Sequence, residues 1–77
     1  MKNPEVVIIG LGYIGLPTAA LVASNNICVH GVDINPKVVD IINKGKIHIV
    51  EPDLDIEVEK AVKNGFLIAD TKSVKAN

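Results

Sequence analysis

The sequence contains no Trp, no Arg, one Cys and only two aromatic residues, Tyr13 and Phe66. So few aromatic rings leave no stacking platform for single-stranded nucleic acid, and a formal net charge of -1 gives no basic surface for a phosphate backbone. Because Cys28 is alone and only His30 and His48 accompany it, neither an intramolecular disulfide nor a zinc-ligand spacing can be assembled. The composition therefore predicts no nucleic-acid partner and no metal site.

Long apolar runs are missing as well. Every apolar stretch is broken by Gly, Pro, Asn or Asp well short of the roughly 18 residues of a membrane span. The N-terminus lacks a charged leader followed by an apolar signal core. We therefore expect a cytoplasmic protein with no membrane segment. A length of 77 residues allows one modest hydrophobic core and no second domain.

What the sequence does contain is an alternation of short apolar runs with helical patterns. The apolar runs predict strands over residues 6–9, 27–33 and 66–69. Between them, the spacing of apolar residues predicts one helix that starts near Gly12 and two more that start after Asn35 and Pro52. Pro17 is awkward within the first helix, so we expect this helix to start irregularly or to bend there.

This order predicts an α/β fold, the N-terminal half of a Rossmann-type doubly wound parallel sheet with the order β-α-β-α-α-β. Residues 1–70 would form this partial dinucleotide-binding domain, and residues 71–77 a polar tail. Because the 6–9 strand is apolar on both sides, we expect helices on both faces of the sheet. The half that would pair with this strand is absent, so we interpret the chain as part of a longer protein. Because the edge of the 6–9 strand is left open, we expect this chain to self-associate into a homo-oligomer.

The segment from Gly10 to Gly15, Gly-Leu-Gly-Tyr-Ile-Gly, fits the pattern G-x-G-x-x-G and directly follows a predicted strand. The next predicted strand ends in an acid, Asp33, 18 residues beyond Gly15. In this context Gly10 allows a tight turn, Gly12 lets the backbone approach a pyrophosphate, and Gly15 lets helix and strand pack closely. The alternative is a Gly-rich turn that binds nothing, and the acid at this spacing disfavours it.

The start of the first helix offers the polar groups that a dinucleotide needs. We expect the free backbone amides of Tyr13 and Ile14 to bind the phosphates, assisted by the positive end of the helix dipole. Asp33 would accept hydrogen bonds from the adenosine ribose and would repel a 2′-phosphate. These features predict NAD as the cofactor in preference to NADP, with Lys37 as a cation close to the site.

The other reactive residues have structural explanations. Cys28 and His30 lie within a predicted strand without an adjacent catalytic partner, and His48 lies in a loop, so we interpret all three as structural. The acidic residues between Glu51 and Glu59 lack the glycine turn of a calcium loop. We interpret them, apart from Glu51, which precedes the helix, as a solvated face of the third helix. Asp53, Asp55 and Glu57 lie in its first turns, where negative charge complements the helix dipole. The sequence thus predicts no catalytic residue.

Two segments resemble the opening of nucleotide-sugar dehydrogenases, namely residues 10–20, Gly-Leu-Gly-Tyr-Ile-Gly-Leu-Pro-Thr-Ala-Ala, and residues 31–35, Gly-Val-Asp-Ile-Asn. The Leu16-Pro17 pair is more particular than the glycines and accounts for the awkward proline. Residues 47–54, Ile-His-Ile-Val-Glu-Pro-Asp-Leu, resemble the UDP-N-acetyl-D-mannosamine dehydrogenase branch, whereas UDP-glucose dehydrogenases tend to carry Tyr-Glu-Pro-Gly-Leu there. The resemblance covers nearly the whole chain.

The resemblance implies an NAD-dependent enzyme that oxidises the C6 alcohol of a UDP-sugar to a carboxylate in two hydride transfers. The catalytic residues of that family lie in later segments that this sequence lacks, so the chain alone is expected to be inactive. Only the cofactor-binding residues carry over, and these are Gly10, Gly12, Tyr13, Ile14, Gly15 and Asp33.

Two other functions begin with the same sequence pattern. A regulatory dinucleotide-sensing module without enzymatic activity, such as those that gate cation transport, also starts with a strand, a Gly-rich turn and an acid. A flavoprotein uses the same fold to bind the ADP part of FAD. Leu16-Pro17 and Glu51-Pro52 favour the dehydrogenase, while a transporter partner or a yellow purified protein would favour the alternatives.

Overall fold

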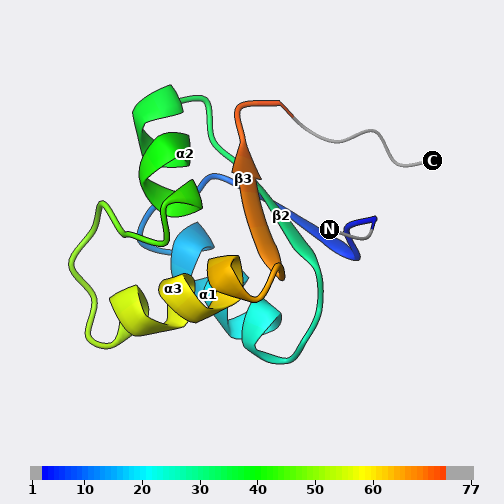
Figure 1. Ribbon diagram of the computed structural model, residues 1–77. Coiled ribbons are helices and arrows are strands. Elements are labelled where there is room, and N and C mark those ends of the chain that lie inside the picture. The colour runs from blue at the N-terminus through cyan, green and yellow to red at the C-terminus, as the bar shows by residue number, and fades with distance from the viewer. Residues whose placement is uncertain (1–2, 73–77) are drawn as a thin grey trace.

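The computed structural model describes residues 3–72, which form a three-stranded parallel sheet and three helices in the predicted order (Figure 1). Residues 73–77 of the predicted polar tail lie outside the described residues. The elements are β1 (Val6–Ile9), α1 (Gly15–Ser24), β2 (Val29–Val32), α2 (Pro36–Asn43), α3 (Leu54–Lys63) and β3 (Leu67–Asp70).

The three strands lie side by side in the order β1-β2-β3 and point in the same direction. Ile9 lies opposite Val32, and Val32 lies opposite Asp70, so the carboxyl ends of all three strands meet at one edge of the sheet. In open α/β sheets ligands bind at this edge. The Gly-rich turn and Asp33 follow β1 and β2 there.

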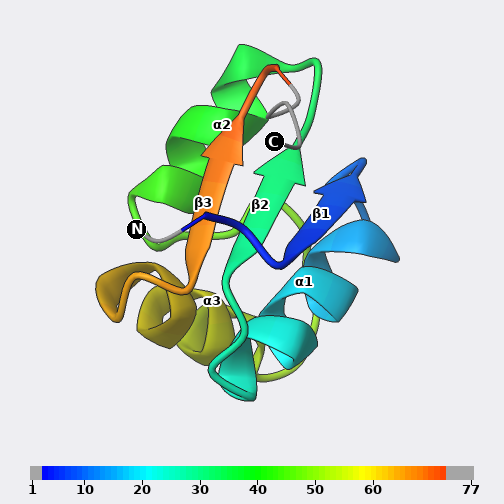
Figure 2. The ribbon, with the colours of Figure 1, turned by 90° about the vertical axis from the view of Figure 1, so that its right-hand side faces the viewer.

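All three helices pack on one face of the sheet, and Figure 2 shows the sheet in front of them. The prediction of helices on both faces is therefore wrong for the residues that the structure describes. Each new strand is added on the same side of the previous one, and right-handed crossovers then place every helix on the same face. On the other face Val7 and Ile9 keep 41% and 78% of their surface exposed.

The hydrophobic core lies between this face of the sheet and the helices. The buried part of α1 consists of Leu16 and three alanines, and such small side chains let the helix approach the sheet closely. The core cluster contains Leu11, Leu16, Ala19, Ala20, Ala23, Val29, Ile42, Ile49, Leu54, Val58, Ala61, Leu67 and Ala69. No helix within residues 3–72 has the length and apolar character to cross a membrane.

The first helix begins at Gly15 instead of near Gly12. Pro17 consequently falls in the first turn, where its missing N–H removes no bond from the helix interior. The residues between Gly12 and Gly15 form a turn, and the first helical bonds run from the Leu16 amide to the Gly12 carbonyl oxygen and from the Thr18 amide to the Ile14 carbonyl oxygen. The proline thus fits because the helix starts later than its sequence pattern indicates.

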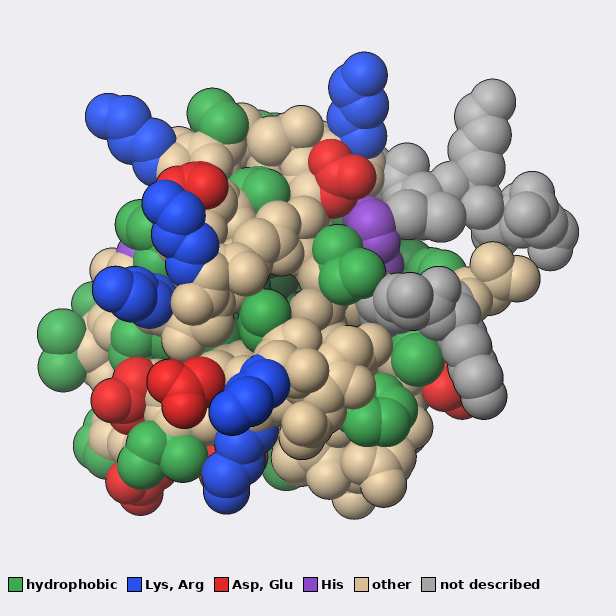
Figure 3. All heavy atoms as spheres, in the orientation of Figure 1, with side chains coloured by type: hydrophobic (Ala, Val, Ile, Leu, Met, Phe, Trp, Pro, Cys, Tyr) green, Lys and Arg blue, Asp and Glu red, His purple; other side chains and the backbone are tan. Residues whose placement is uncertain are grey.

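The second helix has the predicted cap. The Asn35 side chain accepts a hydrogen bond from the Lys37 amide at 3.0 Å, and Pro36 occupies the first helical position. The surface over α2 and α3 carries lysine and acidic side chains interspersed with one another (Figure 3). One such pair is Lys44 with Asp40, whose charged atoms lie 2.9 Å apart.

Asn43, the last residue of α2, fastens this helix to the outer edge of β3. Its side-chain Nδ2 donates to the Ala69 carbonyl oxygen and its Oδ1 accepts from the Ala69 amide, both at 2.8 Å. One side-chain amide thereby pairs with β3 as a neighbouring strand would. This contact satisfies backbone groups that an edge strand otherwise leaves open.

We expect Asn43→Ala to lower the free energy of unfolding of the intact protein by about 2–3 kcal/mol, since two hydrogen bonds are lost and their partly buried partners are left unpaired. Lys44→Ala, next along the chain, removes only an exposed ion pair and should change it by less than about 0.5 kcal/mol. Urea denaturation of both variants measures the difference. Equal stability of the two would show that the Asn43 bonds contribute nothing.

Candidate functional site

The Gly-rich turn is held against the ends of two strands. The Gly10 amide donates to the Val32 carbonyl oxygen at 2.7 Å, and the φ angle of Gly10 is +89°, a conformation that favours glycine. A Cβ atom on Gly15 would collide with the carbonyl oxygen of Gly10. Both glycines are therefore required by the fold of the turn itself.

Gly12 differs, because a Cβ atom placed on it would meet nothing within 4 Å. Its φ angle is not positive either, so nothing within residues 3–72 gives a reason for glycine at this position. The open space in front of its backbone is what a closely approaching ligand requires.

Two exposed residues follow Gly12 at the start of α1. Tyr13 and Ile14 are 67% and 84% exposed, and within residues 3–72 their backbone amides donate to no protein acceptor. The helix has no side-chain cap at this end and no acidic residue in its first turn. Free amides at an uncapped helix start form a suitable place for an anion such as a phosphate.

Asp33 directly follows β2 and lies next to the turn. Its Oδ2 accepts from the Leu11 amide at 3.0 Å and its Oδ1 accepts from the Asn35 amide at 2.9 Å. These two backbone bonds, first that of Asn35 and then that of Leu11, hold the pKa of the Asp33 carboxyl below its ordinary value of 3.8. Partial burial raises this pKa and so opposes them, and the nearby His48 lowers it by a smaller amount. The group is thus ionised at neutral pH, and its oxygens retain lone pairs for a ligand.

The lowered pKa gives stability a pH dependence with a defined sign. A carboxyl whose pKa is lower in the folded state stabilises the fold above its unfolded value and loses this contribution as the pH falls through the folded value. We expect the stability difference between the wild type and Asp33→Ala to be constant above about pH 5 and to shrink below about pH 4. Urea denaturation across this range measures it. A difference that grows on acidification would contradict the assignment.

Two surface hollows adjoin the turn. The larger, of about 550 Å³, extends along β1 and the start of α1 and is lined by Ile8, Ile9, Gly10, Gly12, Tyr13, Ile14, Gly15 and Thr18. The smaller, of about 140 Å³, lies at the ends of β1 and β2 and is lined by Ile9, Gly10, Val32, Asp33 and Ile34. Ile9 and Gly10 line both hollows, so the two hollows adjoin. The free amides at the start of α1 and the Asp33 carboxylate therefore lie along the same edge of the sheet.

Sequence reasoning missed the part played by Leu11 and Gly31. Leu11, an unspecified position of the G-x-G-x-x-G pattern, is fully buried. A Cβ atom on Gly31 would lie 2.9 Å from both Cδ atoms of Leu11, so the glycine in β2 makes room for this side chain. The available signal was a glycine in the middle of a predicted strand, which marks the close approach of another group.

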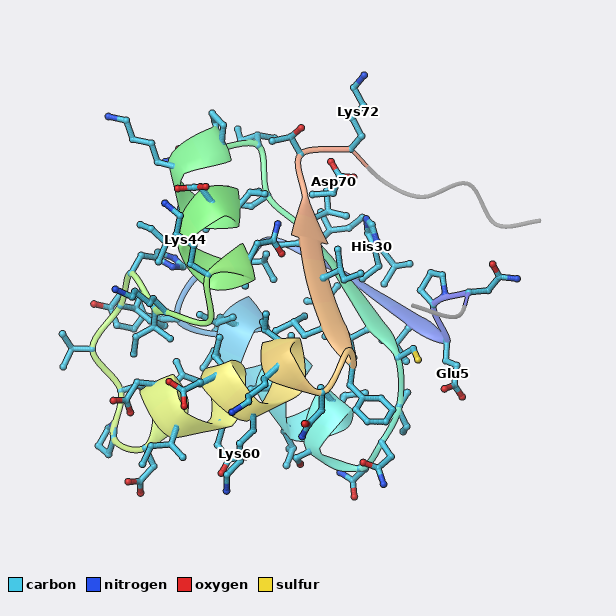
Figure 4. All side chains as sticks on the ribbon, in the orientation of Figure 1. Glu5, His30, Lys44, Lys60, Asp70 and Lys72 are labelled. Carbon is cyan, nitrogen blue, oxygen red and sulfur yellow. The ribbon has the colours of Figure 1, made fainter. Side chains whose placement is uncertain are left out.

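The residues interpreted as structural lie away from the turn or take part in packing. Cys28 is a buried free thiol before β2, and its amide donates to the Glu5 carboxylate. His30 is buried on the sheet face without helices, where its Nε2 lies 3.3 Å from the Lys72 carbonyl oxygen (Figure 4). His48 is half-buried, and its Nδ1 has no hydrogen-bond partner in the described part of the chain.

The arrangement fits the parts of a dinucleotide in their covalent order. Uncapped amides at a helix start suit the diphosphate, the open space at Gly12 admits it, and an ionised carboxylate at the end of β2 suits the hydroxyls of the adenosine ribose. Within residues 3–72, no three His, Cys, Asp or Glu side chains are grouped closely enough to hold a metal ion.

Comparison with known proteins gives a consistent result. Residues 4–77 match the UDP-glucose/GDP-mannose dehydrogenase family, NAD binding domain. The chain is 63% identical over 73 residues to UDP-N-acetyl-D-mannosamine dehydrogenase of Campylobacter jejuni and 60% identical over 77 residues to the enzyme of that name from Escherichia coli K12. These matches cover 95% and 100% of this chain and 18% of each relative.

Among solved structures, the chain resembles the UDP-N-acetyl-mannosamine dehydrogenase Cap5O from Staphylococcus aureus, with a TM-score of 0.85 and 40% identity over 88% of this chain and 16% of that one. The chain thus spans less than a fifth of the length of the relatives that it matches. The family match over nearly the whole sequence and the parallel sheet with its Gly-rich turn agree: this chain belongs to the UDP-glucose/GDP-mannose dehydrogenase family and corresponds to the N-terminal, NAD-binding part of its members.

Proposed function

We propose that the intact protein oxidises the C6 alcohol of UDP-N-acetyl-D-mannosamine to a carboxylate with NAD. The observation that carries the proposal is the identity of 60% or more to dehydrogenases of that name, together with free amides and an ionised carboxylate at one edge of the sheet. The product, a sugar acid still attached to its nucleotide, suits polysaccharide biosynthesis.

The residues of this chain would bind and orient the cofactor. The amides of Tyr13 and Ile14 would hold the diphosphate beside Gly12, while Asp33 would accept hydrogen bonds from the adenosine ribose. When bound, NAD supplies the hydride acceptor for alcohol oxidation. Since Gly10 and Gly15 serve the turn and Asp33 lies at the ribose, the groups that act on the sugar must come from the rest of the protein.

The proposed function is tested by the formation of NADH with UDP-N-acetyl-D-mannosamine, UDP-glucose and GDP-mannose in turn. The intact protein should form NADH fastest with the first substrate. Faster reaction with either of the others would overturn the substrate assignment, and no reaction with any of them would favour a regulatory dinucleotide-sensing module.

The 77-residue chain by itself should form no NADH with any of these substrates, because cofactor-binding groups without a sugar site and a nucleophile cannot catalyse the reaction. The measurement is the same assay on the purified chain, with the intact protein as positive control. Any NADH formation above that of a blank without protein would show that the chain contains catalytic groups.

We also propose that the intact protein acts in the cytoplasm, because Cys28, the one cysteine of this chain, is a free buried thiol. The 77-residue chain by itself should self-associate into a homo-oligomer, since β1 is paired on one side only within the described residues and keeps apolar side chains exposed. Light scattering of the purified chain at high concentration tests this assembly, and a monomer would contradict it.

A further inference from the structure

We propose that Asp33, Leu11 and Gly31 together fix the position of the phosphate-binding turn, so that one carboxylate couples recognition of the adenosine ribose to recognition of the diphosphate. This inference rests on the proposed function, because it concerns the same cofactor site. It assigns a second role to Asp33 and makes Leu11 and Gly31 positioning residues.

The first observation is the set of segments that the Asp33 carboxylate joins. Its Oδ2 holds the amide of Leu11, which lies inside the turn and 22 residues away in sequence. Its Oδ1 holds the amide of Asn35, the cap residue of α2. The carboxylate therefore links the turn after β1, the end of β2 and the entry to α2, in addition to any bond that it makes to a ligand.

The second observation is that the Leu11 side chain is held at its other end. Leu11 is fully buried in the core. Because Gly31 has no side chain, the Leu11 side chain fits against the helix-covered face of β2. The Leu11 amide is hydrogen-bonded to Asp33, and the Leu11 side chain is enclosed against Gly31. Leu11 therefore cannot shift without breaking one of these contacts. The turn that contains Leu11 is thus fixed from both sides of the backbone.

The Leu11 bond also decides which amides remain for the phosphates. A Gly-rich turn presents several backbone N–H groups, and the one at Leu11 is already used by Asp33. The amides of Tyr13 and Ile14 donate to no acceptor in the part of the chain that the structure describes. Because the Gly10 amide donates to Val32 and the Leu11 amide donates to Asp33, the remaining donors lie at the start of α1, so we expect a dinucleotide to lie with its diphosphate there and its adenosine ribose toward Asp33.

The test compares NAD with an analogue whose adenosine ribose lacks the 2′ and 3′ hydroxyls. If Asp33 acts only through these hydroxyls, the wild type and Asp33→Ala should bind the analogue equally. We expect Asp33→Ala of the intact protein to bind the analogue at least about fivefold more weakly than the wild type. A smaller loss overturns the inference. Asp40→Ala, which removes an exposed carboxylate on α2, is the matched control and should bind both ligands as the wild type does.

A second set of variants tests the other side of the turn. Gly31→Ala displaces Leu11 and leaves Asp33 in place, so it should weaken binding of NAD and of the analogue by the same factor, at least about fivefold. In the double variant, Leu11→Val shortens the neighbouring side chain by one methylene and makes room for the new Cβ. This variant should therefore regain most of the affinity. If Gly31→Ala folds and binds as the wild type, or if the double variant binds no better than the single one, the positioning role of Gly31 is wrong.

The outcomes separate this inference from the proposed function. A wild-type protein that binds neither NAD nor its analogue contradicts the proposed function. A wild type that binds NAD better than the analogue, with Asp33→Ala equal to the wild type on the analogue, leaves the proposed function intact and overturns only the coupling.

Discussion

Gly15→Ala is expected to destabilise the intact protein by at least about 3 kcal/mol, or to prevent it from folding. The added Cβ would lie on top of the Gly10 carbonyl oxygen, a backbone atom that cannot rotate away as a side chain would. Relief therefore requires α1 to move away from β1, and the fully buried Leu16 would move with the helix. The yield of folded protein and urea denaturation measure the effect.

The same alanine at two neighbouring glycines should act differently. Gly10→Ala meets no atom but places a side chain at a φ angle of +89°, which should cost about 1–2 kcal/mol of stability. Gly12→Ala meets no atom and no unfavourable φ angle, so its stability should stay within about 0.5 kcal/mol of the wild type. Gly12→Ala should nevertheless lose NAD affinity by at least about tenfold, because its methyl group occupies the space for the diphosphate.

This series separates glycines needed by the fold from the glycine needed by the ligand. A Gly15→Ala protein as stable as Gly12→Ala would contradict the close contact between α1 and the turn. A Gly12→Ala protein that is stable and binds NAD as the wild type does would show that the diphosphate lies elsewhere.

Asp33→Ala is expected to weaken NAD binding by about ten- to a hundredfold, since hydrogen bonds to a charged group contribute about 1.5–3 kcal/mol. It should weaken NADP binding less, because removing the carboxylate also removes the repulsion of the 2′-phosphate. The preference for NAD over NADP, given by the ratio of the two affinities, should therefore decrease. Calorimetric titration of both cofactors into the intact protein measures this ratio.

Lys37→Ala is the control for this prediction. Lys37 lies in the first turn of α2, close in sequence to Asp33, and could attract a 2′-phosphate. Its side chain forms no ion pair within residues 3–72, and we expect its removal to change the affinity ratio by less than about twofold. An unchanged ratio in Asp33→Ala, or a wild type that binds NADP as tightly as NAD, would show that Asp33 does not select the cofactor.

The sequence predicted the order of the elements and the position of the turn because each is encoded locally. Apolar runs mark the strands, Asn35-Pro36 marks the start of α2, and the required φ angle and close contact explain Gly10 and Gly15. The helix-free face of the sheet was not predicted. A strand that is apolar on both sides indicates that both faces of the sheet are buried. It does not indicate whether residues of this chain or of another part of the protein bury them.

Contacts between segments that are distant in the sequence could not be predicted from the sequence pattern either. The pairing of Asn43 with Ala69 joins residues 26 apart, and an asparagine near a helix end is usually read as a cap or a turn. Asp53 was predicted to lie in the first turn of the third helix, but it lies just before α3 with a φ angle of +64°, a left-handed conformation that aspartate tolerates better than most residues.

In our proposal, Asp33 and the turn from Gly10 to Gly15 form the binding site for the diphosphate and adenosine ribose of NAD. A crystal structure of the intact protein with NAD would show where both groups bind. We predict diphosphate oxygens within hydrogen-bond distance of the Tyr13 and Ile14 amides, and ribose hydroxyls on the Asp33 carboxylate while its bond to the Leu11 amide persists. A diphosphate bound away from this turn, or a ribose with no contact to Asp33, would show that these residues do not form the cofactor site.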